Sequence, residues 1–215
     1  MNLILITRIL AAIGLGFAVI GILLRIDDIL RRPFKQDLSR ERGDTRRGIL
    51  YAFTLGMAPW EKESTRIHWL AYLRGILFHV SIFAAFAVLF ASPWLDAIPS
   101  WLKIATAVFL GLGAASGFAG TWMRYSEGNL KAISTPDDYL AVFLTALFIA
   151  LASATLVASG LLPAFYIISA VLLVYIPISK IRHCVYFFYS KFFFGKSFGY
   201  RAVIGQAQGE YHGSE

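Results

Sequence analysis

Long apolar segments separated by polar connections dominate the pattern of this chain. Five of these segments are close to the ~20 residues that an α-helix needs to cross ~30 Å of hydrocarbon. The pattern therefore predicts an all-α integral membrane protein built as a five-transmembrane-helix bundle. The predicted spans cover about residues 3–24, 70–90, 101–123, 138–159 and 162–188.

Signals at and inside these segments refine the prediction. The polar run from Ser134 to Asp138, with Pro136 in the first turn, is typical of a capped helix start, so we interpret Asp137 and Asp138 as capping residues. Pro177 predicts a kink inside the last span. The third span is rich in glycine, which predicts close approach of neighbouring helices at positions 111, 113, 117 and 120.

The charges of the connections predict the orientation. Eleven Lys and Arg residues lie in residues 25–74, and the connection 123–137 carries two more. The two opposite connections, 91–100 and 160–163, carry none. By the positive-inside rule, the N-terminus is outside and the C-terminus is cytoplasmic.

This orientation divides the chain into two predicted parts. Residues 1–194 form the membrane domain, which includes a cytoplasmic loop over residues 25–69, and residues 195–215 form a polar cytoplasmic tail. The loop fits either a solvated connector along the lipid surface or a docking site for another subunit. We expect a multi-pass protein of a prokaryotic cytoplasmic (inner) membrane.

Composition agrees with a membrane protein and excludes some chemistry. Charged residues make up 15% of the chain and hydrophobic residues 58%, whereas a soluble domain averages about 25% charged. The single cysteine, Cys184, excludes a disulfide framework or a multi-cysteine cluster within the chain. The net charge is +7, but the basic residues bracket apolar segments. This placement favours membrane lipids over nucleic acid as the partner.

Two histidines lie inside predicted spans. An imidazole in hydrocarbon is costly unless its nitrogens have partners, and haem iron supplies one partner to each of two histidines. At 1.5 Å per residue, His79 lies roughly 10 Å from the inner boundary of its span, and His183 lies roughly 12 Å from that boundary, placed at Lys191. This match in depth predicts one haem b ligated by His79 and His183. The alternative is that both histidines form hydrogen bonds between helices.

Other side chains near the inner boundary complete the predicted site. Arg74, Lys180 and Arg182 lie close to the two histidines in sequence and suit the haem propionates, although cations there also snorkel to lipid headgroups. A possible quinone or partner site comprises His68, Trp69 and Tyr72. The alternative for these aromatic residues is an interfacial belt. The fourth histidine, His212, lies in the tail, and we do not expect it to ligate a second haem with His68.

Three segments resemble a known family. Residues 74–90 (RGILFHVSIFAAFAVLF), 175–201 (YIPISKIRHCVYFFYSKFFFGKSFGYR) and 132–140 (AISTPDDYL) are similar to the gamma, cytochrome b subunit of respiratory nitrate reductases. They also resemble related subunits of sulfite-reductase-associated and heterodisulfide-reductase-like complexes. The resemblance implies a five-helix bundle, haem b, quinone chemistry and an iron–sulfur subunit on the cytoplasmic face.

The chain departs from this family at the second haem. The nitrate reductase subunit carries two haems, and its inner ligand pair corresponds to His79 and His183 here. The positions of the outer pair are occupied by Leu89 and Phe165, neither of which can ligate iron. The resemblance therefore implies a one-haem variant.

The predicted function combines these points. We expect a haem b subunit of a respiratory oxidoreductase complex that exchanges electrons between menaquinone or ubiquinone and cytoplasmic iron–sulfur partner subunits, rather than a stand-alone enzyme. One alternative is a haem-free membrane anchor or scaffold of such a complex. The other is a small transporter or channel, which is disfavoured because no span carries an acidic or basic relay residue near its middle.

Overall fold

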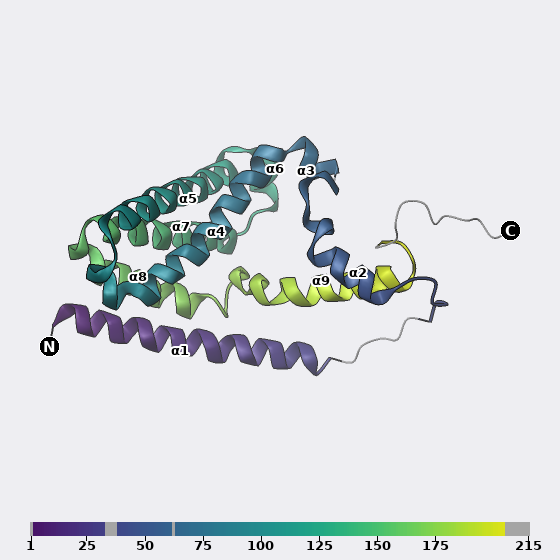
Figure 1. The fold of residues 1–215 in the computed structure, drawn as a ribbon, viewed down its shortest axis with the longest axis horizontal. Coiled ribbons are helices and arrows are strands. Elements are labelled where there is room, and N and C mark those ends of the chain that lie inside the picture. Colours follow the sequence, from purple (N-terminus) through teal and green to yellow (C-terminus); the bar gives the residue numbers. More distant parts are fainter. Residues whose placement is uncertain (1, 33–37, 62, 205–215) are drawn as a thin grey trace. The chain divides into compact units, whose positions relative to one another are not determined.

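The computed structural model describes residues 2–32, 38–61 and 63–204, and every regular element within them is helical (Figure 1). The chain forms two compact units. The first unit holds residues 1–25 and 73–182, and the second unit holds residues 26–72 and 183–215.

Four helices of the described chain are long and apolar enough to cross a membrane. They overlap the first four predicted spans, with ends that differ by up to six residues, and their length and composition are compatible with the predicted multi-pass membrane protein. The longest extension is at α1, which continues six residues beyond the predicted end of the first span. These helices are α1 (Leu3–Leu30), α4 (Trp69–Ala91), α5 (Ser100–Ser126) and α7 (Pro136–Val157).

The fifth predicted span is interrupted. Helix α8 (Leu162–Tyr175) ends before Pro177, and the chain resumes in the single 3₁₀ turn η5 (Lys180–Arg182). Proline cannot donate the backbone hydrogen bond that would continue the helix, so the predicted kink is confirmed. A continuous helix through Phe188 is wrong, because α9 (His183–Tyr200) is a separate helix. The interrupted pair α8 and α9 adds at most a fifth crossing.

Helix α7 forms the centre of the first unit and packs against both α5 and α8 (Figure 1). Its inward residues have no exposed surface, as at Phe148, Ile149 and Ala152. Helix α5 approaches its neighbours through glycine: an added Cβ at Gly113 or Gly117 would collide with side chains of α4 or α7. The predicted close approach is therefore confirmed at these two positions. Van der Waals contact of this kind is what holds helices together where lipid surrounds them.

The start of α7 is tied to the chain that follows α8. The Thr135 amide donates to the Asp138 carboxylate over 2.8 Å, which confirms the predicted cap. The same carboxylate lies 2.5 Å from the ammonium of Lys180. Asp137 accepts hydrogen bonds from the Tyr175 hydroxyl and from the Lys180 amide. The chain has therefore returned to the first turn of α7 by Lys180. We call this end of the first unit, marked by Arg124, Lys131 and Lys180, the basic end.

The second unit is organised around a glycine-mediated contact between α2 (Thr45–Phe53) and α9 (Figure 1). A Cβ on Gly48 would lie 2.3 Å from the backbone carbonyl oxygen of Gly195, so the two backbones touch directly. Asp44 caps α2 by accepting a hydrogen bond of 2.8 Å from the Arg46 amide. The remaining elements of this unit are short, namely η1 (Leu55–Met57), η2 (Pro59–Glu61) and α3 (Glu63–Ile67).

The predicted division between residues 194 and 195 falls inside α9. The first six residues of the predicted tail are helical, and two of them, Gly195 and Gly199, are buried. The sequence pattern missed this because Gly and Lys residues follow the aromatic run and resemble the start of a tail. Residues 205–215, which include His212, lie outside the described residues.

Candidate functional site

His79 lies on the exposed side of α4, in the first unit. Its Nδ1 is 2.7 Å from the backbone carbonyl oxygen of Gly75, one turn earlier. A carbonyl can only accept, so the proton of the neutral ring is on Nδ1 and the lone pair is on Nε2. This is the tautomer in which an imidazole binds a metal through Nε2 while a backbone carbonyl orients the ring.

The helix face beside His79 is open. An added Cβ on Gly75 would meet no heavy atom within 4 Å. Because residues four apart lie on the same face of a helix, the imidazole stands next to a stretch of backbone with no side chain. A flat ring system bound at His79 would find room there. Haem binding on this face of α4 stays a prediction.

Arg74 precedes this face and is half-buried. Its guanidinium donates to the sulfur of Met123, which ties α4 to the end of α5. The contact gives Arg74 a structural role that the sequence did not predict. Its predicted role beside a propionate stays a prediction.

His183 is exposed and is the first residue of α9, in the second unit. Its predicted depth was measured from Lys191, yet the chain already reaches the basic end at Lys180, three residues before His183. The matching depth of the two histidines, which assumed one continuous helix through Lys191, stays a prediction. His79 and His183 belong to different units, and their shared ligation of one iron stays a prediction.

The two cations near His183 differ in their surroundings. Lys180 contacts Asp138 and also donates to the Thr135 hydroxyl over 3.0 Å. Its ammonium is thus part of the network at the start of α7, which the sequence did not predict. Arg182 is half-buried at the end of η5.

The predicted quinone or partner residues lie where α3 meets α4. His68 occupies the turn between these helices and Trp69 begins α4; both are exposed. The hydroxyl of Tyr72 donates to the backbone carbonyl of Met57 over 2.8 Å, which fastens the short η1 segment to α4. The hydroxyl proton of Tyr72 is therefore used in a structural hydrogen bond. Binding of a quinone or a partner by these three residues stays a prediction.

The positions of the family's outer haem ligands are filled by apolar core. Phe165 has no exposed surface and stacks on Phe148 with ring centroids 5.5 Å apart. Leu89 packs against the same core. The small cavity beside Leu89, about 150 Å³ in volume, is far too small for a porphyrin. The described residues at these two positions leave no room for a porphyrin, and the expected single haem stays a prediction.

A polar cluster lies near this small cavity and was missed by sequence reasoning. The Arg8 guanidinium donates to the hydroxyl of Tyr166 over 3.2 Å, and that hydroxyl is 2.8 Å from Ser92 Oγ. Tyr166 is 1% exposed. The cluster provides hydrogen-bond partners for the hydroxyl of Tyr166, the only buried phenol of α8. It joins α1, α8 and the residue that follows α4.

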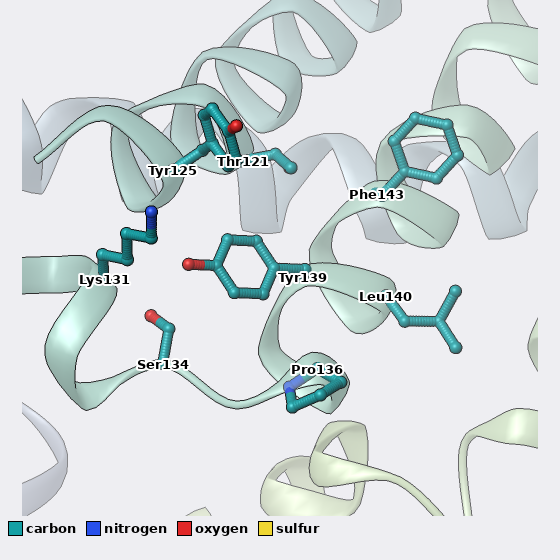
Figure 2. A pocket seen from close by; sticks show the side chains of 8 residues that line it. All are labelled: Thr121, Tyr125, Lys131, Ser134, Pro136, Tyr139, Leu140 and Phe143. Carbon is teal, nitrogen blue, oxygen red and sulfur yellow. The ribbon is translucent and has the colours of Figure 1, made fainter.

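A larger pocket opens at the basic end between α5, α7 and the short helix α6 (Gly128–Ile133), and its volume is about 800 Å³. Figure 2 shows Lys131, Ser134 and the Tyr139 hydroxyl at one end of the pocket, and Leu140 and Phe143 at the other. The other lining residues are Thr121, Tyr125 and Pro136. No periodic pattern in the sequence indicates this pocket, because its walls come from three separate elements.

Comparison with known proteins adds no family assignment. No protein-family model, curated protein or solved structure matches the chain. Within the described residues, no three His, Cys, Asp or Glu side chains come together as a metal site. The resemblance to nitrate reductase gamma subunits therefore stays a prediction.

Proposed function

We propose that this protein is a haem b-containing membrane subunit of a respiratory oxidoreductase complex. The observation that supports the proposal most directly is the hydrogen bond from His79 Nδ1 to Gly75, because it fixes the tautomer in which Nε2 can bind iron. The open helix face at Gly75 gives a porphyrin room beside that nitrogen.

Each residue has a defined task in this proposal. His79 and His183 would hold the iron, and Arg182 would neutralise a propionate. The pairing of Lys180 with Asp138 leads us to assign Lys180 to the α7 start instead. Bound haem would supply one-electron exchange between a quinone pool and a partner protein. The Gly75 carbonyl that accepts the hydrogen bond from His79 Nδ1 would help to set the redox potential of the bound iron.

The proposed cellular location and partners follow from the distribution of basic residues along the chain. The basic end faces the cytoplasm of a prokaryote, where it docks iron–sulfur subunits, and the spans reach menaquinone or ubiquinone in the membrane.

A difference spectrum of the reduced and oxidised full-length protein tests the proposal. We expect a b-type α-band corresponding to one haem per chain. The band should disappear in His79→Ala and in His183→Ala, and it should persist in the matched control His68→Ala. A well-folded protein without pigment would refute the proposal. Loss of the band in the control would instead reassign the ligands.

A second variant separates haem loss from unfolding. Gly75→Leu places a side chain on the open face beside His79 while leaving both histidines intact. Leucine also has a helix propensity about 0.8–1 kcal/mol better than glycine, so the fold should persist. We expect loss of the α-band with unchanged helical circular dichroism. The control Gly16→Leu makes the same change at another open helix position and should keep its haem.

A haem-free anchor or scaffold is the second candidate, and one observation favours it. Lys180 is already at the first turn of α7, so His183 follows the end of the last apolar segment. A histidine there needs no iron, because water and headgroups can satisfy it. Under this alternative, the purified protein is colourless and both histidine variants retain wild-type stability.

A further inference from the structure

The pocket at the basic end (Figure 2) plays no part in the proposed electron transfer. We propose that it binds one anionic phospholipid, with the phosphate at Lys131 and an acyl chain along Leu140 and Phe143. The site would be formed by α5, α6 and α7 within the first unit.

The polar end of the pocket has one suitable donor for a phosphate. The Lys131 ammonium lies 5.3 Å from the centroid of the Tyr125 ring and is exposed. An ammonium is a compact point charge that suits a phosphate oxygen. Behind it, the half-buried Arg124 guanidinium donates to Ser134 Oγ over 3.1 Å and adds to the positive potential.

Three of the four hydroxyl groups in the lining are already used as donors. Ser134 donates to the Leu130 carbonyl over 2.7 Å, and Tyr139 donates to the Arg124 carbonyl over 3.0 Å. Thr121 likewise donates to a backbone carbonyl in its own helix, over 3.2 Å. The fourth hydroxyl belongs to Tyr125, whose ring lies beside the Lys131 ammonium. The positive charge that selects an anionic headgroup at this end therefore comes from the lysine.

The apolar end continues along the membrane-spanning part of α7. Leu140 and Phe143 are three residues apart, so they share one helix face. Their exposed fractions are 50% and 46%. An acyl chain lying on them would run parallel to the helix while its phosphate stays at the level of Lys131. This arrangement matches the amphipathic shape of a phospholipid.

A quinone fits the pocket less well. Its two carbonyl oxygens lie on opposite sides of the ring, so tight binding needs a donor at each, whereas Lys131 and Tyr125 lie at the same end of the lining and Leu140 and Phe143 at the other end have no donor. Reduction of a quinone also needs proton carriers, and the eight lining residues include no carboxylate and no imidazole. The charge of Lys131 and Arg124 favours an anionic over a zwitterionic headgroup.

Native mass spectrometry of the full-length protein, extracted in mild detergent, tests the proposal. We expect one phosphatidylglycerol or cardiolipin to remain bound, or to bind when phosphatidylglycerol is added. Lys131→Gln should lower the occupancy about fivefold, the effect of one lysine at an anionic surface. The matched control is Lys103→Gln, which lies near the start of α5, at the end of that helix away from the pocket. This control should leave the occupancy unchanged.

A second pair of variants tests the apolar end without changing charge. Leu140→Trp fills the acyl groove and should abolish binding, whereas Leu112→Trp, at another lipid-exposed leucine, should not. Equal binding in all variants, retention of a zwitterionic lipid only, or failure to bind added phosphatidylglycerol would overturn the proposal. A quinone released by Lys131→Gln would also overturn it. None of these variants touches the haem residues, so the α-band reports separately on the proposed function.

Discussion

The contact between Gly113 of α5 and Ser81 of α4 provides the sharpest test of the packing in the first unit. A Cβ at position 113 would lie 2.0 Å from Ser81 Oγ and 2.3 Å from Ser81 Cβ. Carbon atoms ordinarily approach to about 3.5–4.0 Å. Rotation of Ser81 moves its hydroxyl but not its Cβ, so Gly113→Ala must push the two helices apart.

The expected magnitude follows from two opposing effects. Overpacking of a close contact costs about 1–3 kcal/mol, and alanine regains about 1 kcal/mol of helix propensity over glycine. The difference between these effects is about 0–2 kcal/mol, and because the contact with Ser81 Cβ at 2.3 Å is far inside the ordinary distance, we expect Gly113→Ala to lower the free energy of unfolding by about 1–2 kcal/mol, the upper half of that range. Ser81 has no exposed surface, and its Oγ has no hydrogen-bond partner among the described residues. Removal of that hydroxyl therefore costs little.

A double-mutant cycle measured by SDS-induced unfolding in mixed micelles checks this reasoning. Ser81→Gly removes both clashing atoms and should rescue Gly113→Ala, with a coupling energy of about 1–3 kcal/mol. Ser81→Ala keeps the Cβ and should rescue only in part. The reasoning fails if Gly113→Ala is within about 0.5 kcal/mol of wild type, or if the effects of the two changes simply add.

Three further predictions concern the α2–α9 contact, the second unit at high pH and the start of α7. Gly48→Ala should separate α2 from α9 and speed amide exchange in both helices, because its Cβ meets backbone atoms at 2.3 Å that cannot rotate away; unchanged exchange would contradict this. The hydrogen bond that Tyr51 donates to Glu61, 2.5 Å long, raises the pKa of the Tyr51 phenol. The stabilisation of the folded state by this hydrogen bond is therefore complete below pH ~10 and is lost as the pH rises through the raised pKa of Tyr51. Tyr51→Phe should reduce the loss of thermal stability at alkaline pH. The same variant should remove a late phase from the phenolate absorbance titration. Asp138→Asn and Lys180→Gln should each destabilise by about 1 kcal/mol and be strongly non-additive in a cycle, whereas additive losses would show that the ion pair contributes nothing.

Several features could be predicted from the sequence because they depend on local physics. The four continuous spans follow from the number of consecutive apolar residues, and the capped start of α7 follows from Thr135 and Asp138. The break at Pro177 follows from the missing amide hydrogen. The glycines of α5 were correctly linked to close packing. The pattern did not, however, distinguish Gly113, which touches a neighbour, from Gly120, which faces open space.

The candidate site was less accessible to sequence reasoning. The residue types at His79 and His183 could be singled out because imidazoles are rare in apolar segments. The hydrogen bond from His79 to Gly75 depends on the geometry of one helix turn. The contact between Lys180 and Asp138 joins residues 42 apart in sequence, which a local pattern does not reveal. The separate helix α9 was not predicted, because the aromatic run after residue 183 continues the apolar pattern beyond the point where the chain has returned to the start of α7.

By itself, the sequence determined that this chain is helical and apolar enough to cross a membrane several times. Hydrophobic length and proline geometry act within one segment and need no partner. Only the tertiary structure decided that α2 and α9 meet through glycine backbones, that Phe165 stacks in an apolar core, and that a pocket opens at Lys131. These features arise where side chains from distant segments compete for the same space, and a one-dimensional pattern carries no record of that competition.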